Sequence, residues 1–535
     1  MSPWRRLRSA GAALALLAAV LMAAVPAVAE VVLHRGNGAE PETLDPHQAT
    51  GFPEALIIYD LFEGLVARGP DGRFGPGLAE RWEVSADGLT HTFHLRPGGV
   101  WSDGSPITAD DVVWSFRRLV DPARTQGRNS HYFWPVRNAR AITEGKVTDL
   151  SQLGVRAVDP LTVAFDLEKP APYFVSMLSF PFLVPLPKEP VERLGRDFFK
   201  PGNLVSSGGY VLAEAVPQSH VKLVRNPRHR DAAKARIDTV YFHATENQDT
   251  ELKRYRAGEL HTTFALPPSQ IPWARANLPD DLRVGPQLGT FYYAPNLTKG
   301  TLADRPKLRQ ALSMALDRDV LAERIAQGGQ VPSFSYVPPG MPGYTPQRPD
   351  WADWPREKRL AEARRLLAEA GYPGGAGLTV DLVYNTSEDW RRVAVATAGM
   401  WQQNLGVRTT LSNLEWKVFL DARRTKRFEG VARQGYVGAY DDPNVFLEFL
   451  RSDVGPENPS GYANPAFDRL LDRASAEQDP ARRLALLADA EAMALADTAV
   501  IPVYTLARAR LVSPRLKGWI ANPLDVNPTR FLWLE

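Results

Sequence analysis

Hydrophobic and polar residues alternate in some segments of the chain, as they do in β-strands. Between residues 89 and 96, every second side chain falls on the same face, with His91, Phe93 and Leu95 on one side and threonines and a histidine on the other. This period of two predicts a half-buried strand. The stretch Val155–Leu167 predicts two further strands, joined by a turn at its Asp-Pro step. Shorter apolar runs predict strands at Val31–His34, Leu378–Tyr384 and Ala499–Thr505.

Other segments carry apolar residues at helical spacing. Thr108 is a suitable N-cap for a helix over Ala109–Leu119. Further helices are predicted at Arg305–Gln327, Arg356–Ala370, Arg391–Leu405 and Arg482–Ala496. The mixture of both kinds of element predicts an α/β protein.

The first thirty residues predict a secretory signal peptide. Arg5, Arg6 and Arg8 precede the uncharged apolar run Gly11–Ala24, and Ala27–Ala29 matches an A-x-A cleavage site. We expect residues 1–29 to be removed and the product to be exported. No later segment reaches the 18 or so consecutive apolar residues that a membrane span requires.

Composition excludes several kinds of site. The 535 residues include no cysteine, which rules out a disulfide scaffold, a thiolate nucleophile, a zinc site with cysteine ligands and a lipid anchor on cysteine. An exported chain of this kind is expected in the periplasm. The 63 Lys and Arg nearly balance the 61 Asp and Glu, so the chain has no basic field suited to nucleic acid.

Catalytic and metal-binding motifs are absent from the sequence. It has no G-x-S-x-G, H-E-x-x-H or P-loop pattern. The nine histidines are scattered along it, and the closest two, His91 and His94, point to opposite faces of a predicted strand. We therefore expect no enzyme activity, no cofactor and no metal site. Without a histidine cluster, a nickel-carrying role is not expected either.

A glycine-punctuated stretch, Val431–Tyr440, predicts a strand with a binding role. Glycine weakens a strand unless another backbone approaches closely, and an extended peptide can add itself to such an edge. Arg423 and Arg433 are candidates for bidentate capture of a carboxylate. The alternative is ordinary sheet packing with surface ion pairs. The adjacent Asp441-Asp442 pair reads as a turn before Pro443, or as an acid/base or calcium pair.

Short motifs spread over most of the chain resemble one family. They are Glu42–His47, Asp60–Leu65, Pro76–Glu80, Trp101–Val112, Tyr255–Glu259, Tyr384–Ser387 and Tyr462–Asp468. Their order and spacing resemble the periplasmic oligopeptide-binding proteins of ABC importers, within the peptide/nickel class of extracellular solute-binding proteins.

The resemblance implies a two-lobed periplasmic-binding-protein fold, type II-like with an extra domain, and therefore three domains. The implied ranges are 30–62, 189–288 and 505–535 for lobe I, 63–188 for domain II and 289–504 for lobe III. It also implies a monomer that closes on a small peptide between its lobes and delivers it to permease subunits in the inner membrane.

Site residues follow from the same resemblance. A peptide is expected to pair with the strand from Gly435 to Val437 and with the region of Phe52. Trp416 and Tyr436 match aromatic pocket positions, and Arg423 and Arg433 match arginines near the C-terminal part of the ligand.

The departures from the family pattern concern the ends of the ligand. Ala439 stands where oligopeptide binders carry an Asp that pairs with the peptide's α-ammonium, and Tyr440 and Pro443 hold this alignment. Asp441, Asp442 or a backbone carbonyl is a candidate substitute. The alternative is a ligand without a free α-ammonium, such as a blocked or modified peptide, an opine or a sugar-linked compound.

Other departures lie nearby. Thr50, Ala326 and Trp390 replace a Glu, a Lys and a His of the well-known peptide binder. The resemblance implies that Thr50 and Ala326 lie near the termini of longer peptides and that Trp390 lies in the same neighbourhood. Gly289 and Val437 stand where some relatives carry a cysteine pair.

Overall fold

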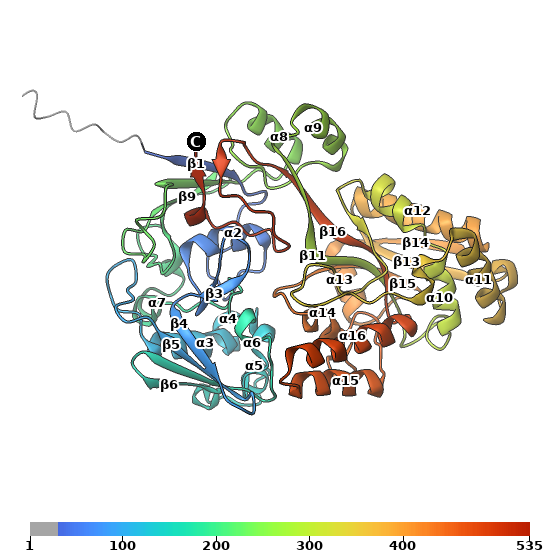
Figure 1. Ribbon diagram of the computed structural model, residues 1–535, viewed down its shortest axis with the longest axis horizontal. Coiled ribbons are helices and arrows are strands. Elements are labelled where there is room, and N and C mark those ends of the chain that lie inside the picture. The colour runs from blue at the N-terminus through green and yellow to red at the C-terminus, as the bar shows by residue number, and fades with distance from the viewer. Residues whose placement is uncertain (1–29) are drawn as a thin grey trace, which may run out of the picture.

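The computed structural model describes residues 30–535, apart from the side chains of Glu388, Trp416 and Lys417. The predicted signal peptide, residues 1–29, lies outside the described residues. Figure 1 shows two lobes side by side, one built mainly from the blue-to-green half of the chain and the other from the yellow-to-red half. None of the helices within residues 30–535 has the length and apolar character needed to cross a bilayer.

The first lobe contains two four-stranded sheets. One has the order β1-β10-β9-β8, in which β1 runs parallel to β10 and the other pairs are antiparallel. Its strands are β1 (Val32–Gly36), β8 (Tyr210–Val216), β9 (His220–Arg225) and β10 (Thr239–His243). Ile57 and Ile58 of α2 (Phe52–Leu61) pack in one core with Leu223 and Val240 of this sheet. Around it lie α7 (Lys188–Leu194), α8 (Gln248–Arg256), α9 (Ile271–Asn277) and the paired strands β17 (Leu516–Lys517) and β18 (Trp533–Leu534).

The second sheet of this lobe is antiparallel throughout, with the order β4-β5-β7-β6. Its strands are β4 (Ala79–Val84), β5 (Thr90–Leu95), β6 (Val155–Asp159) and β7 (Thr162–Asp166). The predicted alternation is confirmed in β5, because His91, Phe93 and Leu95 are buried and the residues between them are partly exposed. Nearby elements are β2 (Val66–Arg68), β3 (Phe74–Pro76), α3 (Ala109–Val120), α4 (Pro122–Thr125), α5 (Ala139–Thr143) and α6 (Phe174–Met177).

The predicted cap of α3 is also confirmed. The Thr108 hydroxyl accepts a hydrogen bond from the Asp111 N–H, and the Asp111 carboxylate accepts one from the Thr108 N–H. This capping box satisfies two backbone donors that the first turn leaves free.

We expect Thr108→Ala to lower the free energy of unfolding by about 1 kcal/mol, the usual cost of removing an N-cap side chain. Urea denaturation of the purified protein measures the change. Thr148→Ala, at an exposed position outside the helices, is the control and should leave the midpoint unchanged. Equal shifts in both variants would contradict a capping role.

The second lobe is built on a six-stranded sheet with the order β12-β16-β11-β15-β13-β14. Its strands are β11 (Leu282–Pro295), β12 (Val331–Pro332), β13 (Thr379–Asn385), β14 (Arg408–Leu414), β15 (Val431–Val437) and β16 (Ile501–Leu511). The helices of this lobe are α10 (Pro306–Met314), α11 (Arg356–Glu369), α12 (Glu388–Leu405), α13 (Trp416–Arg424), α14 (Asn444–Leu447), α15 (Pro465–Ala476) and α16 (Pro480–Ala496).

The long strands β11 and β16 connect the lobes. They pair antiparallel from Leu282 opposite Leu511 to Tyr293 opposite Ile501, with irregular register after Pro286. At one end Leu511 packs in a core of the first lobe, and at the other Ile501 packs in the core of the second. Figure 1 shows this pair passing from one lobe to the other. The predicted domain borders between residues 288 and 289 and between residues 504 and 505 fall inside β11 and β16. The domain ranges therefore stay predictions.

Two predicted elements differ in the structure. The single helix predicted over Arg305–Gln327 is α10 followed by a π-helix, η5 (Val320–Ala326). The break lies next to Arg318, which is 2% exposed and donates hydrogen bonds to the carbonyl oxygens of Ser313, Ser333 and Pro502. A buried guanidinium requires such acceptors, and a straight helix would not bring it to them.

The strand predicted over Val431–Tyr440 ends at Val437. The N–H of Gly438 donates to the Leu288 carbonyl, after which the chain leaves the sheet and Tyr440 stacks on Tyr173 at 5.1 Å between ring centroids. The predicted strand therefore divides into a ladder strand and a segment that contacts the first lobe.

Candidate functional site

The candidate site begins at the second half of β15. This strand pairs with β11 along its length, whereas β13 pairs with it only at Val431 and Ala432. Within the described structure, the edge of Arg433–Val437 that faces away from β11 has no strand beside it. A Cβ added at the exposed Gly435 would meet only the Arg433 guanidinium, at 3.9 Å. This edge can therefore accept an extended backbone, as β-strand addition requires.

Arg433 and Trp390 meet beside this edge. The Arg433 guanidinium lies over the Trp390 ring, 4.5 Å from its centroid, and its Nε donates to Asn385 Oδ1 at 2.8 Å. Trp390 in turn stacks on Phe291, with the ring centroids 5.2 Å apart. Burial, with the like charge of Arg423, lowers the pKa of Arg433 to about 10. The structure thus brings together two residues predicted from sequence.

Arg423 of α13 lines a separate cavity of about 440 Å³, to which Gln434 of β15 also contributes. Its guanidinium lies 5.4 Å from the Phe419 ring centroid, and its buried Nε has no hydrogen-bond partner among the described residues. Burial lowers the pKa of Arg423. A buried donor without an acceptor favours an anionic ligand group, since a carboxylate would complete its hydrogen bonds.

Tyr436, Val437, Ala439 and Tyr440 continue the site towards the first lobe. Tyr436 makes edge contacts with Phe446 and Phe449. Its buried hydroxyl has no hydrogen-bond partner among the described residues. Val437 is 44% exposed, whereas Ala439 is only 7% exposed. Val437 lies opposite Gly289 in the ladder, so these two positions are direct neighbours.

Asp441 and Asp442, the candidate holders of an ammonium group, already have arginine partners. Arg68 of the first lobe lies 3.3 Å from Asp441. Arg483 donates to both oxygens of Asp442, at 2.6 and 2.9 Å. A carboxylate engaged in this way is less available to a ligand cation.

The remaining predicted residues lie apart. Thr50 and Phe52 belong to the first lobe, where Thr50 is exposed and the Arg508 guanidinium lies 4.3 Å from the Phe52 ring centroid. The backbone of Trp416 begins α13, but its side chain lies outside the described residues.

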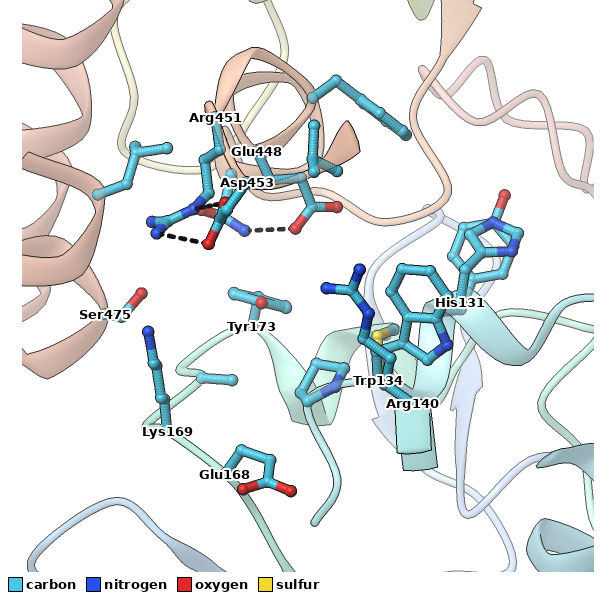
Figure 2. Close-up of a pocket in the computed structure, with 18 of the residues that line it drawn as sticks. His131, Trp134, Arg140, Glu168, Lys169, Tyr173, Glu448, Arg451, Asp453 and Ser475 are labelled. Carbon is cyan, nitrogen blue, oxygen red and sulfur yellow. Dashed lines mark hydrogen bonds and ion pairs between the residues drawn. The ribbon is translucent and has the colours of Figure 1, made fainter. Parts of the chain in front are cut away.

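A cavity of about 280 Å³ lies between the lobes, and sequence reasoning did not predict it. Figure 2 shows His131, Trp134 and Tyr173 on the side of the first lobe, with Glu448 and Arg451 opposite them. The sequence feature that could have indicated this cavity is a single glutamate, Glu448, inside the apolar run from Val445 to Leu450.

Four histidines that are scattered in the sequence gather in the first lobe. His34 Nδ1 lies 3.0 Å from His243 Nε2, and the rings of His220 and His261 lie 6.1 Å from His243 and 5.9 Å from His34 respectively. The spacing of these histidines along the chain does not indicate that the fold brings them together. Within residues 30–535, no three His, Cys, Asp or Glu side chains are arranged to hold a metal ion.

Comparisons with known proteins agree with this geometry. A family model described as bacterial extracellular solute-binding proteins, family 5 middle, matches residues 73–458. The chain is 39% identical over 517 residues to the periplasmic oligopeptide-binding protein OppA of Salmonella typhimurium, covering 96% of this chain and 94% of that protein.

Two solved structures are similar over 95% of the chain. One is the unliganded open form of the murein tripeptide-binding protein MppA, with a TM-score of 0.83, 38% identity and 98% of that chain covered. The other is Haemophilus influenzae OppA in complex with the peptide RPPGFSPFR, with a TM-score of 0.78, 35% identity and 99% of that chain covered. The predicted two-lobed α/β fold is confirmed by these likenesses.

Proposed function

The chain belongs to the bacterial extracellular solute-binding proteins of family 5, and we propose that it binds oligopeptides or peptide-derived ligands between its lobes. In this proposal it is the monomeric periplasmic component of an ABC importer and passes its ligand to the permease subunits in the inner membrane. It binds without chemical turnover. The names of the relatives, which are peptide-binding proteins of the periplasm, support this assignment.

The observation that carries the proposal is the free edge of β15 beside two arginines. Within residues 30–535, no strand pairs with one side of Arg433–Val437, where the backbone offers hydrogen bonds, and Gly435 leaves room for an approaching chain. Main-chain bonding of this kind is independent of ligand sequence. Arg423 and Arg433 supply positive charge for the ligand's carboxylate.

Calorimetric titration with trialanine, tetraalanine and pentaalanine tests the proposal, with free alanine as the control. We expect saturable binding of at least one peptide and none of the amino acid. Absence of binding by every peptide, in a sample whose circular dichroism shows the folded protein, would contradict the proposal. Mass spectrometry of ligand co-purified from cells then identifies the natural compound.

The second candidate is a ligand without a free α-ammonium group. It is favoured by the apolar, buried Ala439 and by the arginine partners of Asp441 and Asp442. Tighter binding of N-acetyl-trialanine than of trialanine would support it.

A further inference from the structure

The cavity between the lobes contains a carboxylate without a cationic partner. Glu448 begins the 3₁₀ helix η8 (Glu448–Leu450), which directly follows α14. Its Oε2 accepts a hydrogen bond from the Asn444 side chain at 2.9 Å, and its Oε1 accepts one from the Tyr440 hydroxyl at 3.4 Å. In the described part of the chain, the half-buried Glu448 takes part in no ion pair, although a carboxylate withdrawn from water normally has one.

The basic side chains of the same cavity already have acidic partners. Arg451 donates to Asp453 at 2.9 Å (Figure 2). It also donates to Asp472 at 3.1 Å. Lys169 lies 3.7 Å from Asp472, and Arg140 donates to Glu144 at 2.8 Å. The other carboxylates of the lining without a cationic partner, Glu168 and Glu457, are exposed to solvent. Glu448 is therefore the carboxylate inside the cavity whose negative charge has no cationic partner among the described residues.

Three tyrosines line the cavity together with this carboxylate: Tyr132, Tyr173 and Tyr440. The Tyr440 hydroxyl donates to Glu448, and the rings of Tyr440 and Tyr173 stack with their centroids 5.1 Å apart. Burial raises the pKa of Glu448 itself to about 7. A carboxylate combined with the faces and hydroxyls of tyrosines suits an ammonium group, which gains both an ion pair and cation–π contacts.

We propose that Glu448 is the counter-ion for the ligand's ammonium group and that the cavity between the lobes holds the amino-terminal residue of the ligand. This inference rests on the proposed peptide-binding function and identifies how that site selects its ligand. The cavity of about 280 Å³ has room for roughly nine water molecules at about 30 Å³ each, enough for a small residue with its ammonium. Tyr440, which lines the cavity, lies three residues beyond the end of β15, so the cavity adjoins the segment that follows the candidate binding strand.

The test compares Glu448→Gln with the wild type on two matched ligands, trialanine and its desamino analogue propionyl-Ala-Ala. We expect the substitution to weaken trialanine binding by about 30-fold to several thousand-fold, the loss typical when one half of a buried charge pair is removed. Binding of the desamino analogue should change less than about threefold. Glu168→Gln, which neutralises an exposed carboxylate on the same cavity, is the control and should leave both affinities unchanged.

Each outcome has one meaning. If the wild type binds trialanine and Glu448→Gln binds it equally well, or loses both ligands equally, the assignment of Glu448 is wrong while the peptide-binding function stands. If the folded wild type binds no peptide, the function itself fails. Glu448→Asp keeps the charge on a shorter side chain and should retain part of the preference for trialanine, which provides a second variant should the glutamine protein fold poorly.

Discussion

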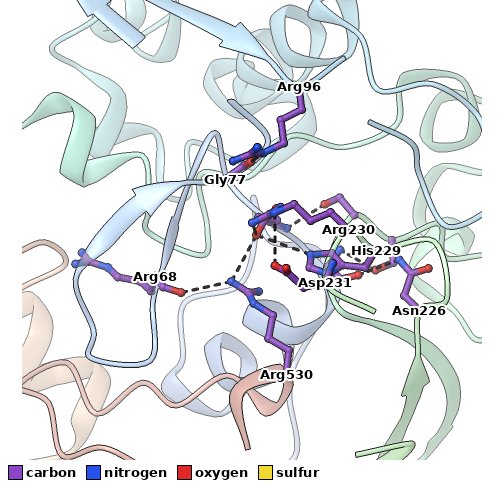
Figure 3. Close-up of polar contacts among 12 residues, drawn as sticks. Arg68, Gly77, Arg96, Asn226, His229, Arg230, Asp231 and Arg530 are labelled. Atoms are coloured by element: carbon purple, nitrogen blue, oxygen red, sulfur yellow. Dashed lines mark hydrogen bonds and ion pairs between the residues drawn. The ribbon is translucent and has the colours of Figure 1, made fainter. Parts of the chain in front are cut away.

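Replacing Glu63 by glutamine is expected to lower the free energy of unfolding by about 3–5 kcal/mol, the cost of breaking a buried ion pair from one side. Glu63 is 2% exposed at the junction between the two sheets of the first lobe. Arg230 donates to both of its oxygens, and an Arg530 guanidinium nitrogen lies 3.4 Å from Oε1. Figure 3 shows Arg230 and Arg530 converging from separate segments of the chain, with a dashed line joining Arg530 to Arg68.

The same carboxylate gives the protein a defined acid sensitivity. Burial alone would raise the pKa of Glu63, but His229, Arg530 and Arg230 outweigh it and lower the pKa to about 2. A carboxylate with a lowered pKa contributes stability above its unfolded value of 4.5, and this contribution is lost as the pH falls towards 2. The difference in the free energy of unfolding between the wild type and Glu63→Gln should therefore become smaller as the pH falls from about 4.5 towards 2.

Urea denaturation at pH 7 and at intervals down to pH 3 measures both effects. Glu83→Gln is the matched control, because Glu83 also pairs with an arginine, Arg81, but has a side chain that is 64% exposed. Exposed pairs contribute about 0–1 kcal/mol. Equal destabilisation by the two substitutions would show that burial does not determine the strength of the Glu63 network.

Replacing Arg423 by glutamine should weaken the binding of trialanine by about 30-fold to several thousand-fold. The Arg423 Nε is buried without a hydrogen-bond acceptor among the described residues and lies on a cavity of about 440 Å³. A ligand carboxylate placed there would form a charge-assisted hydrogen bond that glutamine cannot replace. Calorimetric titration of both proteins measures the loss.

The nearby Arg427, which does not line this cavity, provides the control for this substitution. Its side chain is 66% exposed and pairs with Asp421, so Arg427→Gln should change the affinity little. Trialanine amide, which lacks the terminal carboxylate, should bind Arg423→Gln and the wild type with similar affinity. A loss of the same size for the amide would mean that Arg423 supports the fold of the site and does not contact the carboxylate.

Elements that are determined by residues close together in the sequence could be predicted from it. The faces of β5 and the cap of α3 follow from side chains within a few positions of one another. The break after α10 could not be predicted, because the acceptors of Arg318 include the carbonyls of Ser333 and Pro502, remote in the sequence. The local helical pattern of Arg305–Gln327 contains no sign of them.

The same distinction applies to the candidate site. Arg433 and Trp390 were predicted, the first from its place in the glycine-punctuated strand and the second from family resemblance, and the structure stacks one on the other. Glu448 could not be predicted because the cavity that it lines is completed by Tyr132 and Tyr173, about 300 residues earlier in the chain. A lone carboxylate in an apolar run has no local pattern that distinguishes a binding group from a solvated turn.

The path of the chain through β11 and β16 sets an order for folding during synthesis. The second lobe is one continuous stretch between these strands, so it can complete its core as soon as that stretch is available. The first lobe cannot, because Thr529 donates to the buried Asp60 and Arg530 pairs with the buried Glu63, and both come from the last ten residues. The first lobe, most of which is synthesised before the second, therefore completes its folding after the second lobe. Loss of a few C-terminal residues would leave two carboxylates buried in that lobe without these partners.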